Sequence, residues 1–507
     1  MFESEAPALP AFSSEQEAAW SVISERLAAH GVDLAEGGTT PRSDPDGGDE
    51  VLAVLGRAGS GKTVMLAALA RALKDAGLAV VSADFEPKRK AERRSFAVLA
   101  PTNKAASVLR GKGVQATTIH RIIYTPVYDP DYEKIAEWLT GERKVRPEGG
   151  ALDQQALDRA EAAYREHGSV PGALAAAGVR GADFITGWTR RDDPLDIALV
   201  DEASMLDASQ LDDLRQIFGL IVLFGDPAQL APIGQKGEMV FEALPERRRL
   251  TLEHIHRQAA DNPIIALARA LADPELSFEA FEDRVRAAAG TDARITLASR
   301  ADADLMRESP VLVWRNKVRM RLIRAFRTAH GLPETALVPG EPLICDGLEL
   351  PLRRRRERIE LERRGLIKGA QAVYLAPGRK PGFARVRIVG SDEPGISVAS
   401  IIQIENPETD EPMLLSAASS GAVFVHGAAC TVHKAQGSQW PAVQVFAPDL
   451  MAAARSGREE AGLPLWKRLA YVAITRAEER LIWVTRYMIS RPEAPLGQHG
   501  TADPGAT

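Results

Sequence analysis

The stretch VLAVLGRAGSGKT at residues 51–63 constrains the fold of this chain more than any other part of the sequence. Its apolar first half predicts a buried strand of a parallel sheet, and the amphipathic run VMLAALARALKDAG after it predicts a helix that ends at Gly77. The turn between them fits G-x-x-x-x-G-K-[ST] at every position. The flanking strand and helix favour an α/β domain with a phosphate-binding loop over a glycine-rich turn with a chance lysine.

The groups of this loop suit the triphosphate of a nucleotide. Its glycines let backbone N–H groups curl around phosphate oxygens, the Lys62 ammonium reaches the β- and γ-phosphates, and the Thr63 hydroxyl is a ligand for Mg²⁺. We therefore expect the chain to bind a nucleoside triphosphate. The loop residues expected to hold it are Gly56, Ala58, Gly59, Ser60, Gly61, Lys62 and Thr63.

Two further predicted strands end in polar side chains. IALVDE (197–202) ends in Asp201, which suits Mg²⁺ coordination, and Glu202, which is placed to polarise the water that attacks the γ-phosphate. After the strand IVLF (221–224), the Gln229 amide can hydrogen-bond a γ-phosphate and release it on hydrolysis. The alternatives are an acidic helix start for Asp201 and Glu202 and a proline-rich turn for the segment with Gln229. The complete phosphate loop elsewhere in the chain makes both less favoured.

Other strand ends carry hydroxyl, amide, ammonium and imidazole groups that have no evident place on a nucleotide. The strand FAVLA (96–100) runs into PTNKAA, and ATTIHR spans residues 116–121. Near the far end of the chain, TVHKAQGSQW (431–440) sets similar polar groups in a row that suits neither a core helix nor a plain solvated loop. Proteins use such side chains to contact the phosphates and sugars of nucleic acids.

Composition limits the remaining possibilities. A chain of 507 residues indicates roughly two to four domains. No apolar run reaches the length of about 18 residues that spans a membrane, and the N-terminus lacks a signal-peptide pattern. Only Cys345 and Cys430 are present, which excludes a disulfide framework and fits a reducing cytoplasm. The net charge of −6 argues weakly against non-specific coating of nucleic acid but leaves room for a local basic groove.

Taken in order, these strings and a few others resemble the superfamily-one helicases, in the branch that includes RecD and the phage helicase Dda. The matching strings are SSEQ (13–16), GRAGSGKT (56–63), APTNKAA (100–106), ATTIHR (116–121), VDEAS (200–204), GDPAQLAPIG (225–234), LEHIHRQ (252–258), TVHKAQGSQW (431–440) and YVAITRAEERL (471–481). The forms HKAQG and GDPAQLAPIG favour this branch over UvrD-like relatives, whose large helical insertions the chain lacks.

The resemblance implies an α/β fold with two RecA-like P-loop domains, each a parallel sheet flanked by helices. It also implies an inserted pin-type subdomain and an inserted small β-barrel. Short predicted strands for the barrel lie between roughly 335 and 424, at PLIC, QAVYLA, ARVRIV, SVASIIQI and PMLLS. ATP and Mg²⁺ would lie between the RecA-like domains. The expected ranges are 1–121 with 196–250 for the first RecA-like domain, 122–195 for the pin, 251–334 with 425–490 for the second, 335–424 for the barrel and 491–507 for a disordered tail.

The resemblance also implies roles around the nucleotide. Arg257 and Arg476 resemble arginine fingers that reach the γ-phosphate from the second domain, and Gln16 resembles a residue that reads the adenine edge. Gly437 would link DNA contact to the nucleotide. The alternatives, surface arginines paired with carboxylates and a glutamine on a solvated helix face, stay open. The full catalytic set is Lys62, Asp201, Glu202, Gln229, Arg257 and Arg476.

Single-stranded DNA would cross the top of both domains, with TVHKAQG as the DNA and coupling loop of the second. We call the predicted DNA contacts of the first domain the first grip and those of the second domain the second grip. A protein that closes and opens two such grips on one strand with each ATP would be a translocase. The expected nucleic-acid contacts are Pro101, Thr102, Asn103, Lys104, Thr118, His120, Asn316, Thr431, His433 and Lys434.

Some parts of the chain depart from the family pattern. His256 stands where relatives often carry an aromatic ring, and Gln439 stands where they often carry a glutamate. The insertion at 122–195 is long, with helical patterns around 132–140 and 152–178, and residues 31–50 indicate a mobile loop. Wedge candidates are Tyr124, Tyr128, Tyr132 and Trp138, although packing within the insertion is the favoured alternative for each.

We therefore expect an ATP-dependent DNA helicase that moves 5′ to 3′ on single-stranded DNA and separates duplex, in DNA repair, recombination or replication. The polarity comes from the resemblance alone. The alternative is a DNA-stimulated ATPase or translocase subunit of a larger complex that does not unwind alone, and the second domain disfavours a third interpretation, a small-molecule kinase. Expected partners are single-stranded DNA, the single-strand/duplex junction and single-strand-binding or recombination proteins. We expect a monomer without membrane contact in the cytoplasm of a bacterial or phage-infected cell.

Overall fold

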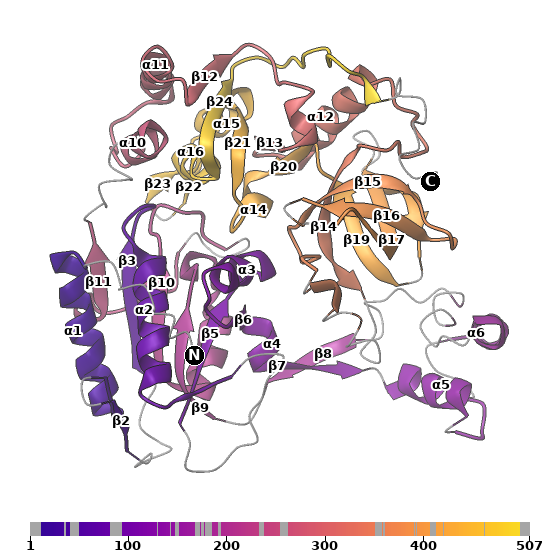
Figure 1. Cartoon of the computed structure of the whole chain (residues 1–507), viewed down its shortest axis with the longest axis horizontal. Coiled ribbons are helices and arrows are strands. Elements are labelled where there is room, and N and C mark those ends of the chain that lie inside the picture. The colour runs from indigo at the N-terminus through magenta and orange to yellow at the C-terminus, as the bar shows by residue number, and fades with distance from the viewer. Residues whose placement is uncertain are drawn as a thin grey trace, which may run out of the picture.

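A computed structural model of the chain shows two parallel sheets, a small barrel and a two-stranded ribbon (Figure 1). It describes residues 12–34, 37–40, 50–81, 94–128, 130–141, 143–147, 152–167, 173, 177, 185–190, 194–232, 238–253, 262–349, 357, 360–362, 364–389, 391, 393–405, 412–418, 420–460 and 462–496. No helix in these ranges is long and apolar enough to cross a membrane.

The first domain is a parallel sheet in the order β11-β3-β10-β9-β5-β4, with β6 paired to β5. Its strands are almost wholly apolar because helices cover both faces. Helices α1 (Ser14–Ala29), α2 (Lys62–Asp75) and α3 (Asn103–Gly111) pack on one face, and α4 (Ile119–Ile123) and α8 (Ala208–Ile217) pack on the other. The strands are β3 (Glu50–Gly56), β4 (Ala79–Val80), β5 (Ser95–Ala100), β6 (Ala116–Thr118), β9 (Leu195–Val200), β10 (Phe218–Gly225) and β11 (Arg249–Leu252).

The second domain is also a parallel sheet, in the order β12-β24-β21-β13-β20. Its strands are β12 (Ile295–Ala298), β13 (Val311–Val313), β20 (Ala429–Thr431), β21 (Trp440–Phe446) and β24 (Ala477–Val484). Its helices are α10 (Pro263–Ala270), α11 (Phe278–Ala289), α12 (Asn316–Ala329), α14 (Val432–Ala435), α15 (Ala447–Arg455) and α16 (Leu465–Ile474). The predicted fold class, two RecA-like domains with two insertions, is confirmed.

The barrel is built from six strands beside the second domain (Figure 1). Pairing of β16 with β17 closes five of them into a ring, and β18 pairs with β17 outside that ring. The strands are β14 (Pro342–Glu349), β15 (Gln371–Pro377), β16 (Phe383–Ile388), β17 (Ile396–Glu405), β18 (Pro412–Ala417) and β19 (Gly421–His426). β19 was not among the predicted strands.

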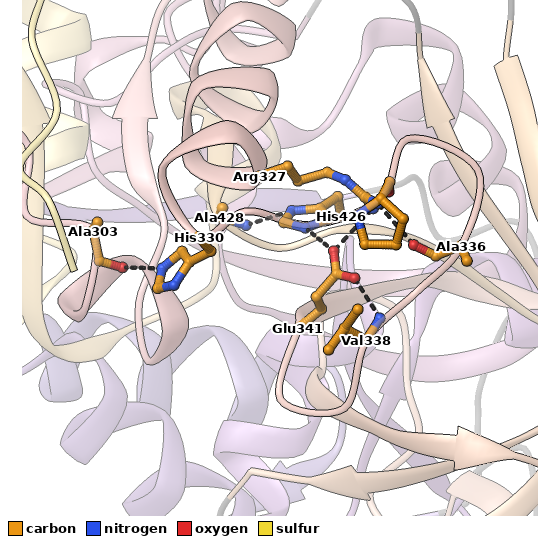
Figure 2. A network of polar contacts seen from close by, with 9 residues as sticks. Ala303, Arg327, His330, Ala336, Val338, Glu341, His426 and Ala428 are labelled. Atoms are coloured by element: carbon orange, nitrogen blue, oxygen red, sulfur yellow. Dashed lines mark hydrogen bonds and ion pairs between the residues drawn. The ribbon is translucent and has the colours of Figure 1, made fainter. Parts of the chain in front are cut away.

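A buried ion cluster joins the barrel to the second domain (Figure 2). The Glu341 carboxylate, before β14, accepts hydrogen bonds from Arg327 of α12 (2.9 Å), from His426 at the end of β19 (3.1 Å) and from the Val338 N–H (2.6 Å). The Ala428 N–H donates to Nδ1 of His426 at 3.2 Å, so Nε2 carries the proton that Glu341 accepts. These bonds satisfy a carboxylate that has no exposure to solvent.

The inserted segment is an antiparallel ribbon that leads to two helices. β7 (Tyr124–Tyr128) pairs with β8 (Ile185–Arg190), and α5 (Pro130–Thr140) and α6 (Gln154–His167) share a small core. Tyr132 and Trp138 pack against that core, as the favoured alternative for the wedge candidates requires. The side chains of Tyr124 and Tyr128 lie outside the described residues.

The structure corrects four details of the predicted organisation. β11 extends the first sheet to Leu252, past the expected boundary at 250, and β19 carries the barrel to His426. Part of the expected mobile loop forms a short ladder, in which Val32 pairs with Thr39. The expected disordered tail is ordered at its start, because Leu496 is buried in the second domain and its N–H donates to His330.

Candidate functional site

The carboxyl ends of three neighbouring strands of the first sheet meet at one cavity. β3, β10 and β9 are paired in register, Leu223 of β10 opposite Ala53 and Val200, so the residues after each strand converge. The cavity measures about 760 Å³ and opens between the two domains. Its lining includes the predicted residues Gln16, Ala58, Gly59, Gly61, Lys62, Thr63, Asp201, Glu202, Gln229, Gly437 and Arg476.

The phosphate loop has the backbone that its glycines predict. Gly59 and Gly61 have φ of +87° and +81°, in the left-handed region that other residues rarely adopt. A Cβ at Gly56 would lie 2.3 Å from the hydroxyl oxygen of Ser60, so this position has no room for a side chain. Neither Gly56 nor Ser60 is among the residues that line the cavity. The Lys62 ammonium donates a hydrogen bond to the carbonyl of Gly56 at 2.5 Å, so its side chain folds back over the phosphate loop.

Asp201, Glu202 and Gln229 form a hydrogen-bonded group in the lining of the cavity. Removal from water, and next the charge of Glu202, raise the pKa of Asp201 to about 7. Glu202 has φ of +51°, the one positive value at a described residue other than glycine. Its carboxylate accepts a 2.9 Å hydrogen bond from the Gln229 amide. This strained backbone aims a carboxylate at the cavity and ties it to the predicted sensor.

The residues present fit a magnesium ion that arrives with a nucleotide. Thr63 and Asp201 both line the cavity, and the raised pKa of Asp201 shows a carboxylate that a nearby cation would stabilise in its charged form. The described residues contain no cluster of three or more His, Cys, Asp and Glu side chains that could hold a metal by itself. The remaining ligands would therefore be phosphate oxygens and water, as Mg²⁺ prefers.

Gln16 also lines the cavity and is 1% exposed, so the alternative of a solvated helix face is wrong. Its amide donates to the Ser60 carbonyl at 3.4 Å and accepts from the Ser13 N–H at 2.9 Å, in a capping box that begins α1. Phe12 lines the cavity beside it and packs on Trp20 with ring centroids 5.5 Å apart. The sequence analysis missed Phe12, although an aromatic residue directly before SSEQ was its signal.

Arg476 reaches the cavity from the second domain. It is 6% exposed and donates to the carbonyls of Val472 (3.1 Å) and Ser438 (3.2 Å), so the alternative of a surface arginine paired with a carboxylate is wrong. Gly437 and Gln439 also line the cavity from this side. Arg257 and His256 lie outside the described residues.

Residues that the sequence analysis did not single out hold the loop after β10 from across the domain interface. Arg468 of α16, itself 2% exposed, donates to the carbonyls of Gln229 (2.5 Å) and Pro227 (2.9 Å). The Glu460 carboxylate accepts from the Ala231 N–H at 2.5 Å. The loop that carries the predicted sensor is thus clamped by the second domain.

The two loops predicted to grip nucleic acid lie against each other. Thr102 caps α3 by accepting from the Ala105 N–H (3.2 Å), and Thr431 caps α14 by accepting from the Lys434 N–H (3.4 Å). Gly437, with φ of +73°, approaches Thr102 so closely that an added Cβ would lie 3.1 Å from its hydroxyl oxygen. Both threonines therefore have a structural role beside any contact with nucleic acid.

The other predicted contacts of the first domain vary in exposure. Lys104 is partly buried, and burial lowers the pKa of its ammonium. Thr118 is 7% exposed at the end of β6, whereas Pro101 and His120 are partly exposed. The side chain of Asn103 lies outside the described residues.

In the second domain, His433 is partly buried, and burial lowers the pKa of its imidazole. Lys434 is exposed and pairs with Asp346 of the barrel at 3.3 Å. Asn316 opens α12 and accepts a 2.7 Å hydrogen bond from Arg319. Val313, just before α12, pairs with Thr431, so the structure brings Asn316 and the second grip to the same sheet edge.

Two parallel sheets that share one phosphate-loop cavity define a two-domain P-loop NTPase. The family model described as AAA domain matches residues 46–292, and the model described as UvrD-like helicase C-terminal domain matches residues 426–484. In this order on one chain, the two models agree with the resemblance to the superfamily-one helicases, and they support a helicase-type enzyme that hydrolyses ATP.

Solved structures give more distant similarities. A Pif1 helicase from Bacteroides in complex with ADP-AlF3 and single-stranded DNA is 15% identical over 95% of each chain, with a TM-score of 0.44. The Pif1 helicase from Candida albicans is 16% identical over 94% of this chain and 95% of that one, with a TM-score of 0.45. No curated protein matches the sequence.

Proposed function

We propose that the chain is an ATP-dependent DNA helicase that moves 5′ to 3′ along single-stranded DNA and separates duplex. The observation that carries this proposal is the position of the TVHKAQG loop. Its Gly437 lines the nucleotide cavity and lies close to Thr102, and the same loop carries Thr431 and His433, the predicted DNA contacts of the second domain. One short loop therefore connects the cavity to the predicted contacts of both domains, and we propose that ATP binding and release change the distance between them.

In the proposed reaction, the phosphate-loop amides and Lys62 would hold the triphosphate, and Thr63 with Asp201 would hold Mg²⁺, which would neutralise charge on the phosphate oxygens. Glu202 accepts a proton from the attacking water. Gln229 hydrogen-bonds the γ-phosphate and releases it on hydrolysis, which changes the contacts of the loop after β10 that Arg468 holds. The second domain supplies positive charge through Arg476, and through Arg257 by resemblance, to the transferring phosphoryl group.

DNA is the proposed polymer, and the 5′-to-3′ direction rests on the resemblance to the RecD and Dda branch. The polar groups of Lys104, His120, His433 and Lys434 suit sugar and phosphate contacts, which position a strand without reading its sequence. Such contacts fit a motor that must pass over every base. Single-stranded DNA and its junction with duplex are therefore the proposed partners.

The test compares ATP-dependent unwinding of one duplex that carries either a 5′ or a 3′ single-stranded tail. Unwinding from the 5′ tail alone supports the proposal. Unwinding from the 3′ tail alone would keep the two-domain motor but reject the direction. DNA-stimulated ATP turnover without unwinding from either tail would instead favour the subunit or translocase interpretation.

A further inference from the structure

The outward face of α12 carries a stripe of three cations and one hydroxyl group. Lys317, Arg321, Arg324 and Thr328 follow one another at spacings of four, three and four residues, which places them on one side of a helix, and all four are exposed. The opposite side of the same helix packs into the core of the second domain through Val318, Leu322, Ile323 and Phe326. Core packing thus holds the backbone of the stripe rigidly.

The stripe forms one wall of a hollow of about 800 Å³. The other wall is the segment Ile489–Arg491 after β24, which adds a fourth cation, Arg491. None of the described residues that line the hollow is acidic. Four positive charges around one open hollow favour the binding of a polyanion. Because the cations lie at intervals along the hollow, they suit a chain of phosphates.

The hollow begins next to the second grip on the predicted DNA path. β13 ends at Val313 opposite Thr431, and α12 starts three residues later at Asn316. From Lys317 to Thr328 the stripe runs along the helix for about 16 Å, at roughly 1.5 Å per residue. A strand that leaves the grip along this line would find cations beside roughly three of its phosphates.

We infer that this hollow, bounded by α12 and the segment 489–491, binds the sugar-phosphate backbone of single-stranded DNA beyond the second-domain grip. This inference rests on the proposed function and extends it. It makes the footprint of the protein on a single strand longer than the two grips require. The extra contacts are electrostatic, so they hold the strand without regard to base sequence and weaken as salt rises.

The test replaces three of the cations together, as Arg321→Gln, Arg324→Gln and Arg491→Gln. The matched control, Arg284→Gln, Arg286→Gln and Arg455→Gln, removes the same charge from exposed arginines elsewhere in the second domain. Binding of labelled single strands from about 6 to about 20 nucleotides is measured for both variants, because single-strand sites span roughly 4–16 nucleotides. ATP turnover stimulated by the shortest strand is measured in parallel.

We expect wild type and control to bind the long strands more tightly than the short ones, and the stripe variant to lose about tenfold in affinity for the long strands alone. Its binding should also depend less on salt, by about two in the slope of log K against log salt. Equal losses for short and long strands, or no loss for either, would overturn the inference, as would a loss confined to blunt duplex. Failure of any single strand to stimulate wild-type turnover would instead reject the proposed function.

Discussion

The phenol of Tyr471, on α16 of the second domain, donates a 2.6 Å hydrogen bond to Asp226, which follows β10 of the first domain. The same phenol oxygen accepts a 2.9 Å bond from the Ala58 N–H of the phosphate loop. Asp226 is 2% exposed, and burial raises its pKa and that of the Tyr471 phenol. One oxygen atom therefore connects the second domain to two separate walls of the nucleotide cavity.

Replacement of Tyr471 by Phe should slow ATP hydrolysis more than it weakens ATP binding. The change keeps the ring but removes both hydrogen bonds, one of them to a buried carboxyl, at a cost of about 1.5–3 kcal/mol. We expect kcat to fall about tenfold or more while KM for ATP stays within about threefold. Tyr374→Phe in the barrel core is the matched control. A kcat equal to wild type would show that this link does not contribute to turnover.

The double change Thr431→Ala with His433→Ala should weaken stimulation by DNA while nucleotide binding survives. Removal of two polar side chains from the predicted DNA path should raise the strand concentration for half-maximal stimulation at least fivefold, at about 1 kcal/mol for each hydrogen bond to the strand. Thr431 also caps α14, so its replacement destabilises that helix by about 1 kcal/mol. His433→Ala alone separates the two effects and should shift stimulation in the same direction. Unchanged stimulation in both variants would remove this loop from the DNA path.

The buried His426 should make the protein less stable in mild acid. Burial lowers its pKa below the ordinary value, although the hydrogen bond to Glu341 acts in the opposite direction. Below about pH 6.5 the unfolded imidazole binds a proton that the folded one excludes. The stability that neutral His426 provides is therefore present above that pH and is lost as the pH falls through this window, by up to about 1.4 kcal/mol per pH unit.

His426→Gln tests this pH dependence, because glutamine can donate to Glu341 and accept from the Ala428 N–H but cannot titrate. The thermal unfolding midpoint of wild type should drop more between about pH 7.5 and about pH 5.5 than that of the variant. His330 and His433, whose pKa values are also lowered by burial, are present in both proteins and cancel in the comparison. Parallel curves for the two proteins would contradict this role of His426.

The parts of the molecule that the sequence predicted are those specified by short stretches. The phosphate loop at 56–63 and the acid pair Asp201–Glu202 each follow an apolar strand, so their place at a sheet edge follows from strand and loop alone. The alternation of short strands in the barrel is equally local, and only β19 was missed there. These elements can therefore be predicted without knowing how the domains pack against each other.

The contacts that the sequence did not predict join residues far apart in the chain. Tyr471 and Asp226 are 245 positions apart, and Arg468 clamps the Gln229 loop across a similar interval, so each depends on how two folded domains meet. The ordered start of the tail has the same cause, because Leu496 finds its pocket only in the finished second domain. The sequence around each of these positions looks like that of an ordinary surface or core residue, so it gives no sign of the distant partner.

The most direct measurement is steady-state ATP hydrolysis with and without a single-stranded oligonucleotide, in wild type and in Lys62→Ala. A motor whose two domains share one nucleotide cavity and one DNA path should hydrolyse ATP much faster once a strand is bound, and Lys62→Ala should abolish turnover in both conditions. Turnover that ignores the strand would contradict the coupling of the two sites, and near-normal turnover in Lys62→Ala would contradict the assignment of the phosphate loop itself.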